Sequence, residues 1–327
     1  MKKILITGVS GYIGTCLFKY LINKKFNVYG TDKKFFFLKK YAKRFYKGNL
    51  NNQIFLSKVL LLLKPDLIIH LAGESTLDGI KKKKNYILNN SIATKNLITC
   101  MQINQIKNLI FSSTAAVYKA SPKNLAETSK ISPNNIYGST KLYCEDLIKK
   151  NSDNINYVIF RFFNVCSAIP KLKVGELHSP ETHLIPLATY KLRKKKKLKI
   201  YGNNYQTKDG TCIRDYIHIS DLCLAFQKSI NSFFNHKVLN SVFNLGTGRG
   251  YSVMDVIKKI STKINLLDAK KYLKISDRRL GDTSRLVCNY NKAVKFLKWR
   301  PKKSYLDNII NDEILWQKNN KFRYFIY

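Results

Sequence analysis

The sequence predicts an α/β fold built on a doubly wound parallel sheet, and three observations lead to this prediction. The first is a series of short, β-rich apolar runs, beginning with Lys3–Thr7, of the kind that form strands buried on both faces. The second is a helical pattern directly after that run, with apolar residues at Ile13, Leu17, Tyr20 and Leu21. The third is a group of glycines between the run and the helix. Strand–helix units of this kind pack helices on both faces of a parallel sheet.

Length and composition place the chain among globular proteins. It has 327 residues, of which 45% are hydrophobic and 12% aromatic, enough for one large or two ordinary domains with a sizeable core. We expect no membrane span and no signal peptide, because the apolar runs fall short of about 18 residues. Seven cysteines without a C-x-x-C pair indicate reduced thiols in a cytoplasm rather than a disulfide framework or a zinc site. We therefore expect no metal ion.

The net charge of +39, from 59 Lys and Arg against 20 Asp and Glu, leaves two interpretations open. A surface this basic attracts polyanions, as in a nucleic-acid-binding protein. Alternatively, the charge reflects a composition rich in Lys, Asn, Ile, Tyr and Phe. The lysines are spread along the chain, with short runs at Lys81–Lys84 and Arg193–Lys197, and no known nucleic-acid motif accompanies them. We favour the second interpretation and expect no nucleic acid partner.

The turn after the first strand has the arrangement of a dinucleotide-binding site. Its sequence is Gly8-Val9-Ser10-Gly11-Tyr12-Ile13-Gly14, a G-x-x-G-x-x-G pattern between a strand and a helix. The first two glycines allow a tight turn and a close approach of backbone N–H groups to a pyrophosphate at the helix start. The last glycine allows the helix to pack closely on the strand. The expected cofactor contacts here are Gly8, Gly11, Tyr12, Ile13 and Gly14.

Two later strand ends extend the expected cofactor site. Asn27–Thr31 is expected to be a strand, and Asp32 at its end would hydrogen-bond the adenosine ribose and repel a 2′-phosphate. We therefore expect NAD rather than NADP, and the two lysines that follow leave some tolerance of NADP open. The strand Asp66–Leu71 runs into small residues that let the backbone pass the cofactor, and we interpret its His70 as a structural residue satisfied by neighbours. These residues add Leu71, Ala72 and Gly73 to the expected contacts.

A Tyr and a Lys near the middle of the chain form the candidate catalytic pair. Tyr137 and Lys141 are four residues apart in a segment expected to be helical, which places them on one face with Cβ atoms about 5–6 Å apart. An ammonium beside a phenol favours the phenolate, and so lowers the pKa of Tyr137 from about 10. Tyr137 is then a candidate general base, tuned by Lys141. Such pairs are common on helix surfaces, so this prediction depends on its context.

The context is a resemblance to a known superfamily. Together with the glycine turn, Thr114 and Tyr137–Lys141 resemble, in order, the extended short-chain dehydrogenases/reductases. Two long segments, Gly175–Pro186 and Ile200–Leu222, resemble more narrowly the UDP-glucose 4-epimerase (UDP-galactose 4-epimerase) family. Arg278–Asp282 completes the resemblance, which covers nearly the whole chain and includes both catalytic and substrate motifs.

The resemblance implies the domain organisation. We expect an NAD-binding Rossmann domain with a doubly wound parallel sheet, and a smaller, interleaved α/β substrate-binding domain. The NAD-binding domain is expected over residues 1–165, with a return segment at about 213–245, and the UDP-sugar-binding domain over residues 166–212 and 246–327. Phe243–Gly248 is expected to be a late strand and a packing turn, although a second phosphate loop is conceivable.

The resemblance also implies residue roles. Asn49 and Leu50 would lie against adenine, Phe163 near the nicotinamide, and Thr114, just past the strand Lys107–Phe111, against a sugar hydroxyl. Further implied cofactor contacts are Asn89, Tyr137 and Lys141. The implied substrate contacts are Thr114, Tyr137, Asn164, His183, Leu184, Tyr201, Arg214, Tyr216, Arg279, Asp282 and Leu286.

Among these substrate contacts, Arg214 and Arg279 would bind the diphosphate, whose charge and shape suit a guanidinium. Arg214 could instead form a structural ion pair with Asp215, and we favour the diphosphate. Asp282 would bind the uridine ribose. Leu286 would gate the substituent at the sugar 2-position, and its intermediate size leads to the hypothesis of some turnover of UDP-GlcNAc and UDP-GalNAc.

The implied reaction is the reversible, NAD-dependent 4-epimerisation of UDP-glucose and UDP-galactose. Tyr137 as a phenolate takes the proton of the sugar 4-hydroxyl while the C4 hydride passes to NAD. The transient 4-keto sugar then turns and takes the hydride back on its other face. A dehydratase or a sugar-nucleotide decarboxylase of this superfamily carries an acid beside Thr114, where this chain has Ala115-Ala116-Val117.

Alternatives stay open. One is a UDP-N-acetylglucosamine or UDP-glucuronate 4-epimerase of the same superfamily. Another is a non-catalytic sugar-nucleotide-binding protein, against which the intact Thr114, Tyr137 and Lys141 argue. A third is a polyanion-binding protein that uses the +39 surface. The resemblance implies a cytoplasmic homodimer, formed through helices of the NAD-binding domain, and leaves open whether the pathway is galactose metabolism or polysaccharide synthesis.

Overall fold

The computed structural model describes residues 2–34, 39–75, 83–178, 180–235, 237, 240–279 and 281–319. The chain divides into two compact units. Unit 1 comprises Met1–Lys119, Lys130–Phe162 and Phe226–Phe243, and unit 2 comprises Ala120–Ser129, Phe163–Ala225 and Asn244–Tyr327. The return segment of unit 1 therefore begins at residue 226 rather than at about 213, and residues 120–129 belong to unit 2.

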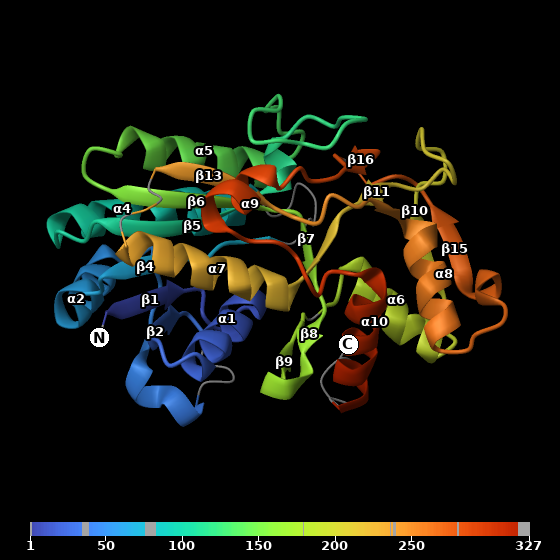
Figure 1. Ribbon diagram of the computed structural model, residues 1–327, viewed down its shortest axis with the longest axis horizontal. Helices are drawn as coiled ribbons and strands as arrows, with labels where there is room; N and C mark the ends of the chain where they lie inside the picture. Colours follow the sequence, from blue (N-terminus) through green and yellow to red (C-terminus); the bar gives the residue numbers. More distant parts are fainter. Residues whose placement is uncertain are drawn as a thin grey trace. The chain divides into compact units, whose positions relative to one another are not determined.

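Unit 1 is built around a seven-stranded sheet in the order β13-β6-β5-β4-β1-β2-β3 (Figure 1). The neighbouring strands from β6 to β3 pair in parallel, as the sequence predicts. The order reverses between β1 and β4, the point at which ligands bind in open sheets of this kind. The strands are β1 Lys3–Thr7, β2 Asn27–Asp32, β3 Phe45–Lys47, β4 Leu67–His70, β5 Asn108–Thr114, β6 Asn156–Phe162 and β13 Ser241–Leu245.

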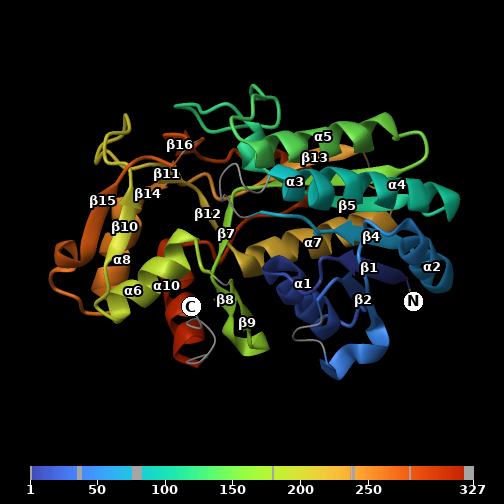
Figure 2. The same cartoon turned by 180° about the vertical axis from the view of Figure 1, so that it is seen from behind.

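Helices cover both faces of this sheet, with α4 and α5 on one face and α1 and α7 on the other (Figures 1 and 2). Buried side chains from α2, α4 and α5 pack with the sheet in one apolar cluster that includes Leu56, Leu97, Ile148 and Leu109. The helical elements are α1 Tyr12–Asn23, η1 Lys39–Arg44, α2 Gln53–Leu63, α3 Lys83–Tyr86, the π-helix η3 Ile87–Ile92, α4 Ala93–Ile103, η4 Ala115–Val117, α5 Ile136–Lys150 and α7 Ile219–Phe234.

Unit 2 combines small sheets with helices around a second apolar core. The core includes Ile185, Leu192, Ile257 and Ile309 from α6, α8 and α10. Its strands are β7 Asn164–Cys166, β8 Ala168–Ile169, β9 Val174–Gly175, β10 Leu198–Tyr201, β11 Ile213–Arg214, β12 Tyr216–His218, β14 Tyr251–Ser252, β15 Leu273–Ser276 and β16 Arg285–Leu286. Its helical elements are η5 Pro170–Leu172, α6 Leu184–Arg193, α8 Val253–Lys263, η6 Ala269–Tyr272, α9 Asn291–Leu297 and α10 Leu306–Asn319.

Several predicted elements differ from the structure at their ends. Thr114 is the last residue of β5, not a residue past the strand, since β5 continues beyond Phe111. The helix expected to begin at Asn89 is already helical at Lys83, the first residue described after the gap, and continues through a π-helical turn. Two residues of the lysine run Lys81–Lys84, namely Lys81 and Lys82, lie outside the described residues.

None of the helices in the described ranges is long and apolar enough to cross a membrane. All seven cysteines are free, buried thiols. Burial raises the pKa of thiols such as Cys144 and Cys288, which keeps them protonated and unreactive at neutral pH.

Candidate active site

The turn between β1 and α1 can be built only with glycine at two positions. Gly8 has a φ of +70°, and a Cβ on it would lie 2.5 Å from the backbone nitrogen of Ala72. A Cβ on Gly14 would lie 2.2 Å from the carbonyl oxygen of Gly8, well inside van der Waals contact. The absence of side chains at Gly8 and Gly14 therefore lets the start of α1 lie close to the ends of β1 and β4, as the glycine pattern predicts.

The start of α1 and the end of β2 form a cradle that fits a dinucleotide. Gly11 is the N-cap residue of α1, and it provides no side-chain hydrogen bond to the first turn of the helix. Helix starts leave backbone N–H groups and a positive dipole end that bind anions. Asp32 lies beside this turn, because its carboxylate accepts hydrogen bonds from the backbone N–H groups of Ser10 at 3.0 Å and Lys34 at 3.2 Å.

Three further predicted cofactor contacts have partners within unit 1. The side-chain oxygen of Asn49 accepts a hydrogen bond from the backbone of Asn51 at 3.1 Å, and so shapes the turn before α2. Leu50 is buried in the core. The side-chain oxygen of Asn89 accepts a hydrogen bond from Lys33 Nζ at 2.5 Å, which places Asn89 near the carboxyl end of β2. Their contacts with a cofactor stay predictions.

The end of β5 and the first turn of α5 bring Thr114 and Tyr137 together. Although Tyr137 as a residue is only partly buried, protein surrounds its phenol, and this burial raises the pKa of Tyr137 to about 12. The hydrogen bond with the Thr114 side chain acts in the opposite direction and lowers this pKa. The ring of Tyr86 also packs near Tyr137, with 6.3 Å between the ring centroids.

Lys141 lies one helical turn after Tyr137, as predicted, and is almost fully buried. Its Nζ donates a hydrogen bond to the carbonyl oxygen of Ser112 at 2.9 Å and lies 4.8 Å from the centroid of the Phe111 ring. Burial lowers the pKa of Lys141 to about 8. A Cβ on Gly73 would lie 2.8 Å from Asn90 Oδ1 and 3.3 Å from this Nζ, so the two side chains leave little room for a larger residue after β4.

The net pKa of Tyr137 in the protein alone is raised, whereas the sequence predicts a lowered value. Burial is the largest cause, because desolvation penalises the phenolate. The Lys141 ammonium is itself desolvated and donates a hydrogen bond to Ser112 O.

His70 has the structural role predicted for it. Its Nδ1 lies 2.6 Å from Thr7 Oγ1 and its Nε2 lies 3.0 Å from Thr94 Oγ1. Burial, with a contribution from the charge of Lys141, lowers the pKa of His70 to about 3. The imidazole is thus neutral and hydrogen-bonded inside unit 1.

In unit 2, two predicted substrate contacts bond to each other. Arg214 is buried at the end of β11, and its Nη2 donates a hydrogen bond to Asp282 Oδ1 at 2.5 Å. The alternative of an Arg214–Asp215 ion pair is wrong. The buried Asp215 carboxylate instead accepts hydrogen bonds from the backbone N–H groups of Thr247, Gly248 and Cys288 at 2.8–3.1 Å. The turn after β13 is thus a packing turn rather than a phosphate loop.

Neighbouring strands of unit 2 bring further predicted contacts together. Arg214 is paired with Leu286 between β11 and β16, and Asn164 with Tyr216 between β7 and β12. Asn164 is exposed, whereas Tyr216 is buried, and burial raises the pKa of Tyr216. Phe163, just before β7, is buried and donates its backbone N–H to the carbonyl oxygen of Leu245 at 3.0 Å.

Cationic side chains complete the predicted set in unit 2. The guanidinium of Arg279 stacks on the ring of Tyr201, 4.1 Å from its centroid. His183, just before α6, contacts the buried carboxylate of Glu176, which raises the pKa of His183 to about 9, and the charge of Arg279 opposes this rise. Leu184 is the first residue of α6. A protonated His183 beside Arg279 is chemically suited to an anionic ligand.

A model of the NAD dependent epimerase/dehydratase family matches residues 4–246. The chain belongs to this family. The UDP-glucose 4-epimerase of Halalkalibacterium halodurans is 33% identical over 98% of this chain and 97% of the relative. The solved UDP-glucose 4-epimerase from Bifidobacterium longum in complex with NAD⁺ and UDP has a TM-score of 0.89 at 28% identity, covering 99% of this chain and 100% of that chain. The UDP-Glc/GlcNAc 4-epimerase from Campylobacter jejuni has a TM-score of 0.80 at 29% identity, with coverages of 98% and 100%.

Membership of the NAD dependent epimerase/dehydratase family confirms the predicted resemblance and fold class. No sequence pattern points to the residues that hold α5, the helix of Tyr137 and Lys141, in place. The buried Asn90 accepts the backbone N–H of Glu74 at 2.7 Å and donates to Thr140 Oγ1 at 3.1 Å, and so joins α5 to the loop after β4.

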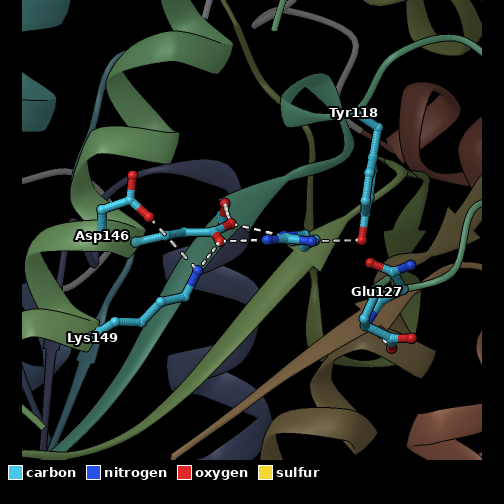
Figure 3. Close-up of polar contacts among 8 residues, drawn as sticks. Tyr118, Glu127, Asp146 and Lys149 are labelled. Atoms are coloured by element: carbon cyan, nitrogen blue, oxygen red, sulfur yellow. Dashed lines mark hydrogen bonds and ion pairs between the residues drawn. The ribbon is translucent and has the colours of Figure 1, made fainter. Parts of the chain in front are cut away.

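A second group that the sequence does not predict is a buried ion pair between α5 and β6, whose polar contacts are drawn in Figure 3. Arg161 on β6 donates two hydrogen bonds to Glu145 on α5, at 2.9 and 2.6 Å, and a third to the hydroxyl of Tyr118 at 2.8 Å. Ser113, on β5, donates to the same carboxylate at 2.5 Å. Lys149, one helical turn later, forms an ion pair with Glu145, with 3.3 Å between Nζ and Oε2. A buried Glu one turn after Lys141 is the only local sign of this pair.

Proposed function

We propose that this chain interconverts UDP-glucose and UDP-galactose by 4-epimerisation, using NAD that it retains between turnovers. The observation that carries the proposal is the arrangement of Thr114, Tyr137 and Lys141 at the end of β5 and the start of α5. The names of the relatives, which are UDP-glucose 4-epimerases at about one-third identity over nearly the whole chain, support the substrate.

In this proposal the residues of unit 1 bind NAD and move one proton. The glycine turn and Asp32 bind the dinucleotide, because the turn has no room for side chains and Asp32 is fixed beside it. NAD, when bound, supplies the hydride acceptor and a positive charge that favours the phenolate. The Oη of Tyr137 takes the proton of the sugar 4-hydroxyl and later returns it. Thr114 hydrogen-bonds Tyr137, and Lys141 keeps an ammonium in the same region.

The residues after Thr114 support epimerisation over elimination. Elimination of water needs a carboxylic acid near the sugar. The turn after β5 is Ala115–Val117, and its side chains carry no acid or base. With Tyr137 to exchange a proton and no acid in this turn, the return of hydride to the keto sugar is the chemistry that we propose for this arrangement.

Unit 2 is proposed to hold the UDP group. Arg214 would exchange its bond with Asp282 for the diphosphate, and Asp282 would be released to bind ribose hydroxyls. Arg279 would add positive charge. Most of the binding energy would then come from contacts with the nucleotide rather than with the reacting sugar ring, and the ring would be free to turn.

The test is incubation of purified protein with UDP-galactose and no added cofactor, beside Tyr137→Phe. We expect the wild type to form UDP-glucose, and the variant to lose nearly all activity because it lacks the proton acceptor. NAD released on denaturation is expected from both proteins. No conversion by the wild type, even with NAD supplied and with N-acetylated and uronic-acid sugars tried, would refute the proposal and favour a non-catalytic sugar-nucleotide-binding protein.

Substrate breadth is proposed to depend on Leu286. Leu286 is partly buried and lies beside Arg214 in the β11–β16 pair. Because its side chain is of intermediate size, we propose some activity on UDP-GlcNAc and UDP-GalNAc. Leu286→Tyr is expected to abolish that activity and keep the UDP-galactose reaction, as measured by chromatography of both sugar pairs. Full activity of Leu286→Tyr on acetylated sugars would show that Leu286 is not the gate.

We also propose that two copies of the chain associate through helices of unit 1. The outer side of α2 leaves Ile54, Leu61 and Leu62 exposed by 83%, 61% and 64%, which is more apolar surface than a single helix ordinarily shows to water. The proposed compartment is the cytoplasm, in keeping with the free thiols. Light scattering should give the mass of two chains, and a mass of 37.9 kDa would refute the dimer.

A further inference from the structure

Four side chains of unit 2 bring metal-ligand atoms together, and we call them the His–Glu cluster: Glu176, His178, Glu181 and His183. One ligand atom from each side chain lies within 4.8 Å of the other three. All four come from the single segment between β9 and α6, with the spacing E-x-H-x-x-E-x-H. We propose that the His–Glu cluster binds one zinc ion.

The distances within the cluster are close to those of a tetrahedral zinc site. Zinc takes nitrogen and oxygen ligands at about 2.0–2.1 Å, so that neighbouring ligand atoms lie about 3.3 Å apart. His178 Nδ1 lies 3.1 Å from Glu176 Oε1 and 3.8 Å from Glu181 Oε2. The same oxygen of Glu176 also contacts His183 Nδ1. The two His178 contacts are within about half an ångström of this separation, and the ligand atoms of all four residues, which lie within 4.8 Å of one another, reach it by side-chain movements of about 1.5 Å or less.

Glu181 gives the second, independent reason for a cation at this point. Its side chain is only 6% exposed. One oxygen, Oε1, is held by the backbone N–H groups of Thr182 and His183, each at 2.8 Å. The other, Oε2, is buried and accepts no hydrogen bond from the described residues. Burial and the neighbouring Glu176 charge raise the pKa of Glu181 to about 7, which shows that a negative charge here is costly unless a proton or a cation joins the carboxylate.

The two imidazoles lie where one metal ion could bind both. The rings of His178 and His183 lie 5.1 Å apart at an interplanar angle of 89°. Two neutral imidazoles at this separation can share one metal ion. Zinc binding would displace protons from the cluster, so the affinity is expected to fall as the pH is lowered.

The ligand set selects zinc among the common ions. Mg²⁺ and Ca²⁺ take oxygen ligands, and a site with two imidazoles is a poor match for them. Two nitrogens and two carboxylate oxygens in a compact group suit Zn²⁺. Because the protein fills all four positions, the ion would be structural and would fix the segment that enters α6. This set contains no cysteine, so the lack of a C-x-x-C pair, from which we expected no metal ion, does not bear on it.

The experiment uses the full chain, stripped of metal by a chelator and titrated with Zn²⁺ against a chromogenic zinc indicator. We expect one zinc ion per chain with a dissociation constant below a micromolar. His178→Gln and Glu181→Gln should each weaken binding at least about tenfold, since each removes one of four ligands. The matched control is Asp307→Asn, which removes a half-exposed carboxylate of unit 2 outside the cluster and should bind zinc like the wild type.

X-ray absorption at the zinc edge of the wild-type complex tests the site without a variant. A shell of nitrogen and oxygen at about 2.0–2.1 Å supports the proposal, and sulfur at about 2.3 Å would overturn it by assigning zinc to cysteines. Binding of much less than one ion per chain, or equal affinity of the wild type and both variants, would also overturn it. His178 and Glu181 are not among the predicted substrate contacts, so these outcomes are separate from those of the epimerase test.

Discussion

At the scale of single residues, the chemistry depends on the competition that sets the pKa of Tyr137. Burial raises this pKa to about 12, and the hydrogen bond with Thr114 lowers it. With a pKa of about 12, only about one phenol in 10⁴ is ionised at pH 8. In the protein without a bound cofactor, the Tyr137 side chain is therefore a neutral phenol. The positive charge of a bound nicotinamide would complete the shift that Lys141 does not achieve by itself.

Removing the Thr114 hydroxyl should raise the pKa of Tyr137 further. A hydrogen bond to a charged group contributes about 1.5–3 kcal/mol, so Thr114→Val is expected to lower kcat/KM about 10–100-fold near neutral pH. Because Tyr137 is proposed to act as a base, a higher pKa should move the rise of activity to higher pH. The measurement is the pH profile of kcat/KM.

Thr114→Ser is the matched control for this prediction. It keeps the hydroxyl, and with it the cap that Thr114 provides to the backbone N–H of Ala116 at 3.1 Å. The serine variant should keep the wild-type profile. A valine variant whose profile has the same midpoint as the wild type would show that the hydroxyl does not tune Tyr137.

At the scale of elements, the position of α5 depends on the ion pair between Glu145 and Arg161. The pair joins α5 to β6 inside unit 1, and both side chains are buried, at 0% and 2% exposure. Hydrogen bonds from Arg161 and Ser113 lower the pKa of Glu145 and overcome the opposing effect of burial. Since Tyr137 and Lys141 are on the same helix, this pair fixes the catalytic residues relative to the sheet.

Glu145→Gln should destabilise the protein by about 3–5 kcal/mol, because it leaves the Arg161 charge buried without its carboxylate. Glu145→Gln combined with Arg161→Met should lose less, since it removes both charges. Lys149→Gln, which removes only a partly exposed partner, should cost less than about 1 kcal/mol. Urea unfolding at neutral pH measures all three variants.

The pH dependence of these variants gives a second readout. A carboxyl with a lowered folded pKa contributes stability above its unfolded pKa and loses it as the pH falls through the folded value. The wild type should therefore lose stability as the pH falls below about 4.5, the ordinary value for Glu. Glu145→Gln should show a smaller loss over the same range. An equally steep acid limb in wild type and variant would contradict the assigned role of the pair.

What could be predicted from the sequence at this scale was set by local patterns. The strand Lys3–Thr7, the glycine turn and the helix around Tyr137 follow from residues that are neighbours in sequence, and the structure has them at the predicted places. The Arg214–Asp282 bond and the Glu145–Arg161 pair join residues far apart in sequence. The hydrophobic periodicity of the sequence does not predict such pairs. The rise in the pKa of Tyr137 likewise depends on burial by distant segments.

At the scale of the whole molecule, the main feature is charge. Even if each of the 20 acidic residues paired with one of the 59 basic residues, 39 basic side chains would have no acidic partner. Mutual repulsion among such charges favours more expanded states and so opposes folding. Salt screens this repulsion, with a Debye length that falls from about 30 Å at 0.01 M to about 8 Å at 0.15 M.

The melting temperature should therefore rise when NaCl is raised from about 0.01 M to about 0.15 M, since repulsion between exposed lysines is screened more than the few exposed ion pairs are. Differential scanning calorimetry of the NAD-loaded protein measures the shift. The control is a neutral solute at the same osmolality, which should give a smaller change because it does not screen charge. Chloride is the suitable anion, because sulfate also strengthens hydrophobic burial. A melting temperature that falls with NaCl would mean that attractive ion pairs outweigh the repulsion, and the excess of basic residues would then have to be compensated by their arrangement on the surface.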